Sequence, residues 1–297
     1  MGLAATGICS MLGAAINVVP FMLHRSVPGI GPYVLPAYLF AAVPAILAAL
    51  AYAILASAMP RAGGSYIYAS RGLHPYLGFV ASFSQWFGLS IAIGVVSYVL
   101  IPFVRDVFAT LGVDGVAELL DTGPVRVGLA LTFLWTSVLI NMRGLQLYER
   151  ILVPLMFLMF VLGGVVVVAG FLFDQGDFAT GLLAAEGVPV PEVVPVAFSW
   201  TSFLAGSAIL FSSFIGFDSI AQAGGEAKNP GRSLPLAIGV AVLTVGTFYL
   251  LFTAAVYHAV PWQFVAERAQ DQDLTAPGLL GYVLSPTWTV LIVVGAA

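Results

Sequence analysis

The stretch Ser207–Pro235 reads SAILFSSFIGFDSIAQAGGEAKNPGRSLP and joins an apolar run to polar residues that a plain membrane anchor does not need. Its apolar part ends in FIGFD at residues 214–218, which places a glycine and an acid at the expected depth of the hydrocarbon core. An ionisable residue at that depth is costly and is a functional candidate by default. We therefore interpret this stretch as a broken helix that carries half of a substrate site.

The composition of the whole chain sets the fold class. Of the 297 residues, 60% are hydrophobic and only 8% are charged, whereas soluble domains carry roughly 25% charged residues. Several stretches exceed the ~20 apolar residues that cross a bilayer as a helix. The sequence predicts an all-α polytopic membrane protein whose main surroundings are the lipid bilayer.

Eight membrane spans are predicted from the apolar stretches. Their approximate bounds are 3–23, 33–59, 76–103, 125–142, 151–173, 197–223, 234–258 and 287–297. The last span covers only about half of the ~20 residues that a bilayer requires. We therefore expect a sequence that is truncated within its eighth span and does not function alone.

Basic residues in the loops give the orientation. With the N-terminus inside, six Lys and Arg residues fall in inner loops and four in outer loops. Because Lys and Arg are enriched in cytoplasmic loops, we expect a multi-pass protein of the cell membrane with a cytoplasmic N-terminus.

Two spans contain small or glycine-bearing interruptions at corresponding places. Gly13-Ala14-Ala15 interrupts span 1, and residues 213–217 interrupt span 6. Such interruptions point to the binding site of a transporter. Free N–H groups at the end of a half-helix can hold a carboxylate, and free C=O groups at the opposite end can hold an ammonium or a cation. Close packing of helices through small residues is the alternative, and both interpretations stay open here.

Three further residues are candidates for gating, coupling or binding. Asp218 is the only acid inside a span, and it could gate, couple protons, pair with an arginine or accept hydrogen bonds from backbone N–H groups of the break. Asn17 could face a substrate or ion, or bond to a neighbouring helix. Trp86 lies deep in span 3 and could line the pocket.

Several classes of function lack the residues that they need. Cys9 is the only cysteine, which excludes an internal disulfide and a cysteine metal site. The sequence has no metal-spaced His/Cys/Glu set, phosphate loop, Ser-His-Asp arrangement or basic patch for nucleic acid. We expect no catalytic residue, no metal site, no cofactor and no nucleic-acid partner. A sensor or enzyme that uses a central cavity without net transport is the remaining alternative to a transporter.

Four motifs, taken in order, resemble those of the amino acid–polyamine–organocation (APC) superfamily. They are LGAAI at 12–16, PRAGGSYIY at 60–68, NMRG at 141–144, and FIGFD at 214–218 followed by EAKNP at 226–230 and LP at 234–235. The resemblance implies an amino acid permease that works by alternating access. It also implies a five-plus-five inverted repeat with broken helices 1 and 6, in which residues 1–173 form the first repeat and 197–297 an incomplete second one.

The resemblance also assigns roles to residues of the two breaks. The substrate carboxylate is expected at the backbone of Gly13, Ala14 and Ala15. The substrate amine and side chain are expected at Ser213, Phe214, Ile215 and Gly216. Asp218 corresponds to an acid that many members carry just past the break.

This chain departs from the family pattern at several of these positions. Ala15 replaces the usual second glycine, Asn17 replaces a phenylalanine, and Gly225 stands where many relatives have a glutamate. Span 5 lacks the lysine that substitutes for sodium in some relatives. Coupling to Na+ or H+, the particular amino acid or amine, and the oligomeric state are therefore left open.

Overall fold

The computed structural model describes residues 2–142, 145–192, 195–222, 227 and 229–296. Within these ranges the secondary structure is entirely helical, without a strand. The predicted all-α fold class is confirmed. Arg143, Gly144, Gly225, Glu226 and Lys228, which belong to the motifs discussed above, lie outside the described residues.

Five described helices are long and apolar enough to cross a membrane. They are α3 (Val34–Ala58), α5 (Pro75–Thr110), α7 (Gly123–Met142), α8 (Leu145–Leu172) and α12 (Pro230–Ala259). Each reaches the ~20 residues that a helical span requires. The shorter helices that join or follow them are α4 (Ser65–Gly72), α6 (Asp114–Asp121), α9 (Gln175–Glu186), α13 (Trp262–Asp271), α14 (Ala276–Leu280) and α15 (Pro286–Ala296).

Two further apolar segments are interrupted. The first consists of α1 (Gly2–Met11), the 3-10 helix η1 (Ala14–Asn17) and α2 (Val19–Ser26). The stretch Leu3–Asn17 and helix α2 are bent by 56° relative to each other. The second consists of α10 (Trp200–Phe211), η3 (Ser212–Phe214) and α11 (Asp218–Gln222). The division of the chain into two inverted repeats stays a prediction.

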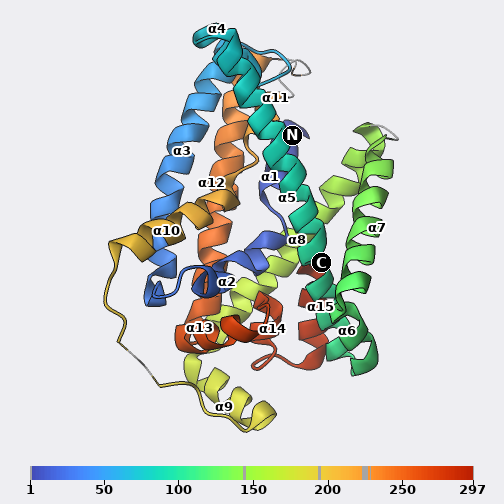
Figure 1. Cartoon of the computed structure of the whole chain (residues 1–297), viewed down its shortest axis with the longest axis vertical. Helices are drawn as coiled ribbons and strands as arrows, with labels where there is room; N and C mark the ends of the chain where they lie inside the picture. The colour runs from blue at the N-terminus through green and yellow to red at the C-terminus, as the bar shows by residue number, and fades with distance from the viewer. Residues whose placement is uncertain (1, 143–144, 193–194, 223–226, 228, 297) are drawn as a thin grey trace.

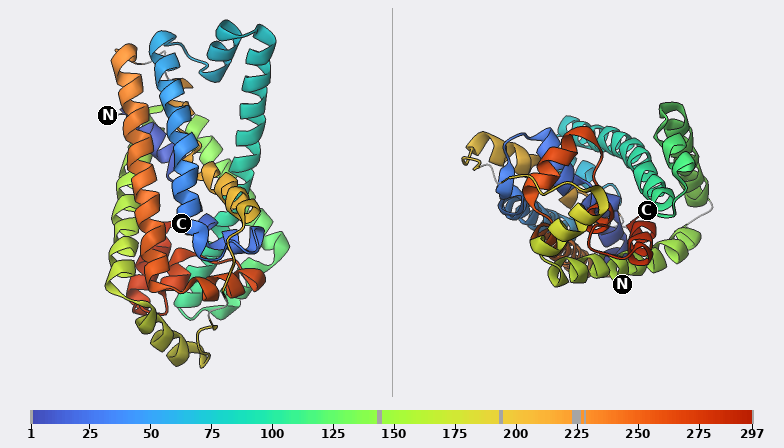
Figure 2. Two further views of the ribbon diagram at one scale, coloured as in Figure 1. Left: turned by 90° about the vertical axis from the view of Figure 1, so that its left-hand side faces the viewer. Right: turned by 90° about the horizontal axis from the view of Figure 1, so that it is seen from below.

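Helix α12 forms the centre of the bundle, between α3 and α8 (Figures 1 and 2). Its side chains Val245, Tyr249 and Val256 are completely buried. Helices α5 and α7 stand to one side of this core, where Ile101, Leu120 and Ala130 form a second, small hydrophobic cluster. Helix α1 of the first interrupted segment packs against α12 and α8, whereas α10 of the second packs against α3.

Glycine allows α8 and α12 to approach closely. A Cβ atom added at Gly170 of α8 would lie 2.4 Å from the carbonyl oxygen of Ala255 in α12. Gly164, less than two turns earlier in α8, has open space within 4 Å of its Cβ position. Small residues at such contacts let helix backbones meet within a membrane, so Gly170 determines the spacing of these two helices.

We predict that Gly170→Ala destabilises the bundle, because the added methyl group must push α8 and α12 apart. Overpacking of this kind costs about 1–3 kcal/mol, so the midpoint of thermal unfolding in detergent should fall by several degrees. Gly164→Ala is the matched control and should leave the midpoint unchanged or slightly raised, since alanine is favoured over glycine in a helix. Equal midpoints for the two variants would contradict this account of the α8–α12 contact.

Candidate functional site

The first break separates α1 from the 3-10 turn η1. Gly13 is extended, with φ −137° and ψ 177°, so that the chain turns sharply after Met11. The Leu12 N–H donates to the Ile8 carbonyl at 2.6 Å and completes the last turn of α1. Carbonyl groups at the C-terminal end of a half-helix carry a partial negative charge, which favours a cationic donor at this point.

The second break requires a glycine. After η3, Ile215 is extended, with φ −70° and ψ 135°. Gly216 then has φ +132°, in the left-handed region that residues with a Cβ atom rarely adopt. The new helix α11 starts at Asp218. The sequence motif FIGFD thus contains the extended residue, the left-handed glycine and the first acid of the following helix.

The two breaks touch each other through their backbones. A Cβ atom at Gly216 would lie 2.6 Å from the Ser10 carbonyl oxygen and 3.0 Å from the Met11 nitrogen. The Ser219 hydroxyl of α11 lies 3.0 Å from the Ser10 hydroxyl and donates to the Gly216 carbonyl at 2.7 Å. The structure therefore brings together the two interruptions that the sequence places about 200 residues apart.

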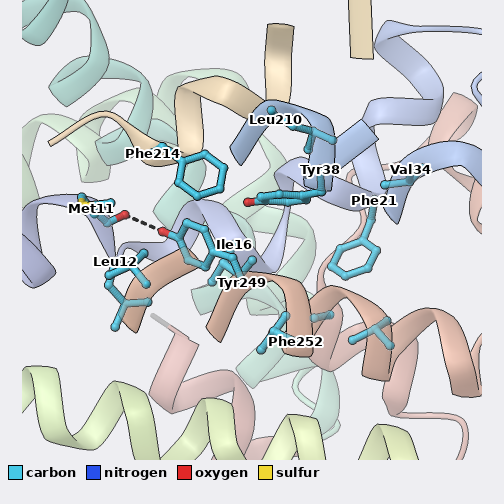
Figure 3. Packing of buried hydrophobic residues seen from close by; sticks show 14 of the residues in the cluster. Met11, Leu12, Ile16, Phe21, Val34, Tyr38, Leu210, Phe214, Tyr249 and Phe252 are labelled. Carbon is cyan, nitrogen blue, oxygen red and sulfur yellow. Dashed lines mark hydrogen bonds between the residues drawn. The ribbon is translucent and has the colours of Figure 1, made fainter. Parts of the chain in front are cut away.

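Aromatic rings fill the space beside this contact (Figure 3). Phe214 is 1% exposed, and its ring centre lies 5.8 Å from that of Tyr38 in α3 and 6.4 Å from that of Tyr249 in α12. A cavity of about 20 Å³ lies next to the first break, where Leu12, Ile16 and Asn17 line it. This volume suits about one water molecule, so the space beside the first break is too small for an amino acid in this arrangement of the helices.

The other predicted site residues lie in different surroundings around the contact between the two breaks. Asn17 is buried and lines the small cavity, whereas the Ile215 side chain is half exposed. The Ser213 and Tyr38 hydroxyls are buried beside each other. The backbone of Ala14 and Ala15 forms η1. The breaks thus contribute mainly backbone groups and the Phe214 ring.

Trp86 is not part of the cluster around the breaks. Its side chain is 63% exposed on α5, and its ring packs against Phe83 at 5.8 Å between ring centres. A position on a uniformly apolar helix does not reveal which face turns towards the core. The role of Trp86 in the pocket stays a prediction that this arrangement does not favour.

Asp218 contacts α5 through a residue that the sequence analysis did not identify. The side-chain amide of Gln85 donates a hydrogen bond to the Asp218 carboxylate. Backbone N–H groups of Gly216, Asp218 and Ser219 also lie around this carboxylate. Asp218 is therefore held as the first residue of α11 and ties the second break to α5, while its role in gating or coupling stays a prediction.

A second set of charged contacts lies at the other end of the molecule. Asp273, in the segment between α13 and α14, contacts Arg25 of α2 at 3.4 Å and Arg126 of α7 at 3.3 Å. The Arg126 guanidinium lies 4.0 Å from the centre of the Tyr98 ring in α5. Asp273 thus links α2, the C-terminal part of the first broken helix, to the α5–α7 pair.

A neighbouring ion pair involves Glu186 of α9. Its carboxylate contacts Arg268 of α13 and accepts a hydrogen bond from the Tyr282 hydroxyl. Burial, and then the Glu186 carboxylate, raise the pKa of Tyr282 to about 12. Tyr282 therefore stays protonated at neutral pH and serves as a hydrogen-bond donor that holds α9 against the segment before α15.

No metal site emerges among the residues whose placement is known. That part of the chain contains no group of three or more His, Cys, Asp or Glu residues arranged to hold an ion. Coupling to Na+ or H+ stays a prediction.

The sequence does not identify two polar residues that contact the breaks: the Tyr249 hydroxyl donates to the Met11 carbonyl, and the Gln85 amide donates to the Asp218 carboxylate. Each is a polar group within a long apolar helix, where a hydroxyl or amide must find a partner because water is absent. That signal is present in the sequence for both residues. The identity of each partner depends on tertiary packing and is not encoded locally.

We predict that Gly216→Ala separates the two breaks, because the new methyl group would meet the Ser10 carbonyl and would strain a left-handed backbone. Backbone strain of this kind alone costs about 1–3 kcal/mol, so the thermal unfolding midpoint should drop by several degrees.

Gly13→Ala is the matched control for this variant. Gly13 has no atom within 4 Å of its Cβ position, and its extended conformation suits any residue. The unfolding midpoint of the Gly13→Ala protein should stay within about a degree of the wild type. A substitution that meets no neighbouring atom and strains no backbone changes the free energy of unfolding by less than ~0.5 kcal/mol. The account fails if Gly216→Ala is as stable as Gly13→Ala.

Comparison with known protein families adds independent evidence. A family model described as "Amino acid permease" matches residues 1–297. The chain is 27% identical over 269 residues to "Cationic amino acid transporter 4, vacuolar" of Arabidopsis thaliana. This alignment covers 88% of this chain and 42% of that protein.

Two other relatives show similar coverage. "Cationic amino acid transporter 4" of Mus musculus is 27% identical over 289 residues, covering 88% of this chain and 40% of that protein. "Low-affinity putrescine importer PlaP" of Escherichia coli (strain K12) is 25% identical over 257 residues, covering 86% of this chain and 52% of that protein. The chain thus spans about half the length of the curated relatives that it matches.

Proposed function

This chain belongs to the amino acid permease family, and from that premise we propose that it works as a secondary transporter that moves an amino acid or related amine across a membrane by alternating access. The family membership confirms the resemblance that its four motifs indicate. The family is one of permeases rather than enzymes, and the five long apolar helices agree with a multi-pass membrane protein. We propose the cell membrane as its location, with the N-terminus in the cytoplasm.

The proposed substrate carries a positively charged amine. Relatives of this chain are named as cationic amino acid transporters and as a putrescine importer. The chemical group common to those named substrates is an alkylammonium. The carbonyl end of α1 at Met11 offers the partial negative charge that attracts such a group, and the N–H groups at Gly13–Ala15 suit a carboxylate when the substrate has one.

The contact between Gly216 and Ser10 is the single observation that carries this proposal. Two helix breaks in backbone contact create free N–H and C=O groups within one small region, as broken-helix transporters require. A ligand bound at one break would touch the other. Movement of one broken helix relative to the other would then open or close access to the ligand.

Counterflow measures the proposed activity directly. A full-length version of the protein would be purified and reconstituted in liposomes loaded with unlabelled L-arginine or putrescine, and labelled compound would be added outside. We expect accumulation of label that depends on the internal compound, with protein-free and unloaded liposomes as controls. Binding of the amine without exchange would reject transport and favour the sensor or enzyme alternative.

We predict that Asp218→Asn lowers uptake roughly tenfold or more, because a hydrogen bond to a charged group contributes about 1.5–3 kcal/mol. If Asp218 couples protons, uptake should also lose its dependence on pH, since an amide cannot change charge in that range.

Asp121→Asn is a suitable control for the charge change. Asp121 is an exposed acid that pairs with Arg105 at 3.3 Å, far along the chain from the breaks. Its substitution should leave uptake nearly unchanged. An Asp218→Asn protein with normal uptake and a normal pH profile would remove Asp218 from any gating or coupling role.

A further inference from the structure

The hydroxyl of Tyr249 donates a hydrogen bond to the carbonyl oxygen of Met11 (Figure 3). Tyr249 lies on the central helix α12 and is completely buried. Met11 is the last residue of α1, directly before the first break. A side chain of a helix outside the two breaks therefore occupies a backbone acceptor that the break exposes.

The Met11 carbonyl is a hydrogen-bond acceptor at the C-terminal end of α1. Carbonyl groups of the last helical turn have no partner within the helix, and they carry the negative end of the helix dipole. The preceding acceptor at Ile8 is taken by the Leu12 N–H. Tyr249 supplies the donor for the Met11 carbonyl.

The surroundings place this hydrogen bond where both breaks meet. The ring of Tyr249 packs against Phe214 of the second break at 6.4 Å and against Tyr38 at 6.2 Å between ring centres. Ser10, the residue before Met11, contacts Gly216 of the second break. The Tyr249 hydroxyl thus lies between the α1 carbonyl end and the aromatic ring of η3.

We propose that the Tyr249 hydroxyl occupies the position in which a substrate amine would bind the Met11 carbonyl, and that the ammonium group of a substrate must displace it from that carbonyl. This inference rests on the proposed function. An ammonium forms a charge-assisted hydrogen bond that is roughly twice as strong as a neutral one, so it can replace the phenol. A neutral hydroxyl ligand gains nothing by the exchange.

Tyr249 is therefore a residue that sets the affinity of this subsite. Its hydroxyl must leave the Met11 carbonyl before any ligand can bind there, so the same cost is subtracted from the affinity of each ligand. The preference for an ammonium comes from the stronger, charge-assisted hydrogen bond that it forms with the carbonyl.

Tyr257 provides a matched control on the same helix. It lies eight residues after Tyr249, and its hydroxyl donates to the Pro20 carbonyl of α2 at 3.0 Å and lies 3.1 Å from His24 Nε2. Both tyrosines thus bond to a carbonyl of the first broken helix. Only Tyr249 bonds to the carbonyl at the break.

The test compares equilibrium binding of L-arginine, putrescine and 1,4-butanediol to the purified wild-type, Tyr249→Phe and Tyr257→Phe proteins. Tyr249→Phe keeps the aromatic ring and should bind both amines about three- to tenfold tighter, as removal of one competing hydrogen bond predicts. Its preference for putrescine over the neutral diol should stay unchanged, because the cost of displacing the hydroxyl is common to both ligands. Tyr257→Phe should stay within about twofold of the wild type, since substitutions away from a site change little.

Unchanged or weaker amine binding by Tyr249→Phe, with normal wild-type binding, would overturn this inference and leave the proposed function intact. A wild-type protein that binds neither amine would instead reject the proposed function.

A measurement on the wild type covers the case in which Tyr249→Phe does not fold. Addition of putrescine should change the ultraviolet difference spectrum of tyrosine, since a phenol leaves its carbonyl partner, and Tyr257→Phe should retain that change. Absence of a tyrosine signal at saturating putrescine would overturn the proposal.

Discussion

A backbone carbonyl that leaves its helix within the hydrocarbon core must find a donor in the protein, because no water is present to supply one. The first break creates such carbonyls at the end of α1, and the second break creates a left-handed turn at Gly216. The Met11 carbonyl receives the Tyr249 hydroxyl, and Ser10 and Gly216 lie in backbone contact. The two breaks therefore depend on each other and on α12 for their stability.

The remaining polar contacts connect this centre to the flanking helices. Gln85 joins α5 to α11 through Asp218, and Asp273 joins α2 to α7 through Arg25 and Arg126. These two connections lie towards opposite ends of the molecule (Figure 1). Alternating access, as proposed here, would require such connections to release one at a time, so that the α5–α7 pair moves relative to the broken helices.

The sequence predicts the location of the breaks well because their signal is local. Glycine and aspartate within an apolar run, as in FIGFD, have few structural explanations inside a membrane, and the structure interrupts the helix there. The partners of the breaks are not local. Gln85 and Tyr249 each contact residues more than a hundred positions away, and the uniformly apolar α5 gives no indication that Trp86 faces away from the core.

In the proposed mechanism, residues 13–15 and 213–216 form one substrate-binding site. Hydrogen–deuterium exchange of the purified protein, with and without saturating putrescine or L-arginine, tests it most directly. The account predicts that backbone amides at both breaks exchange more slowly in the presence of the amine. Protection at only one break, or at neither break while the amine is bound, would contradict it.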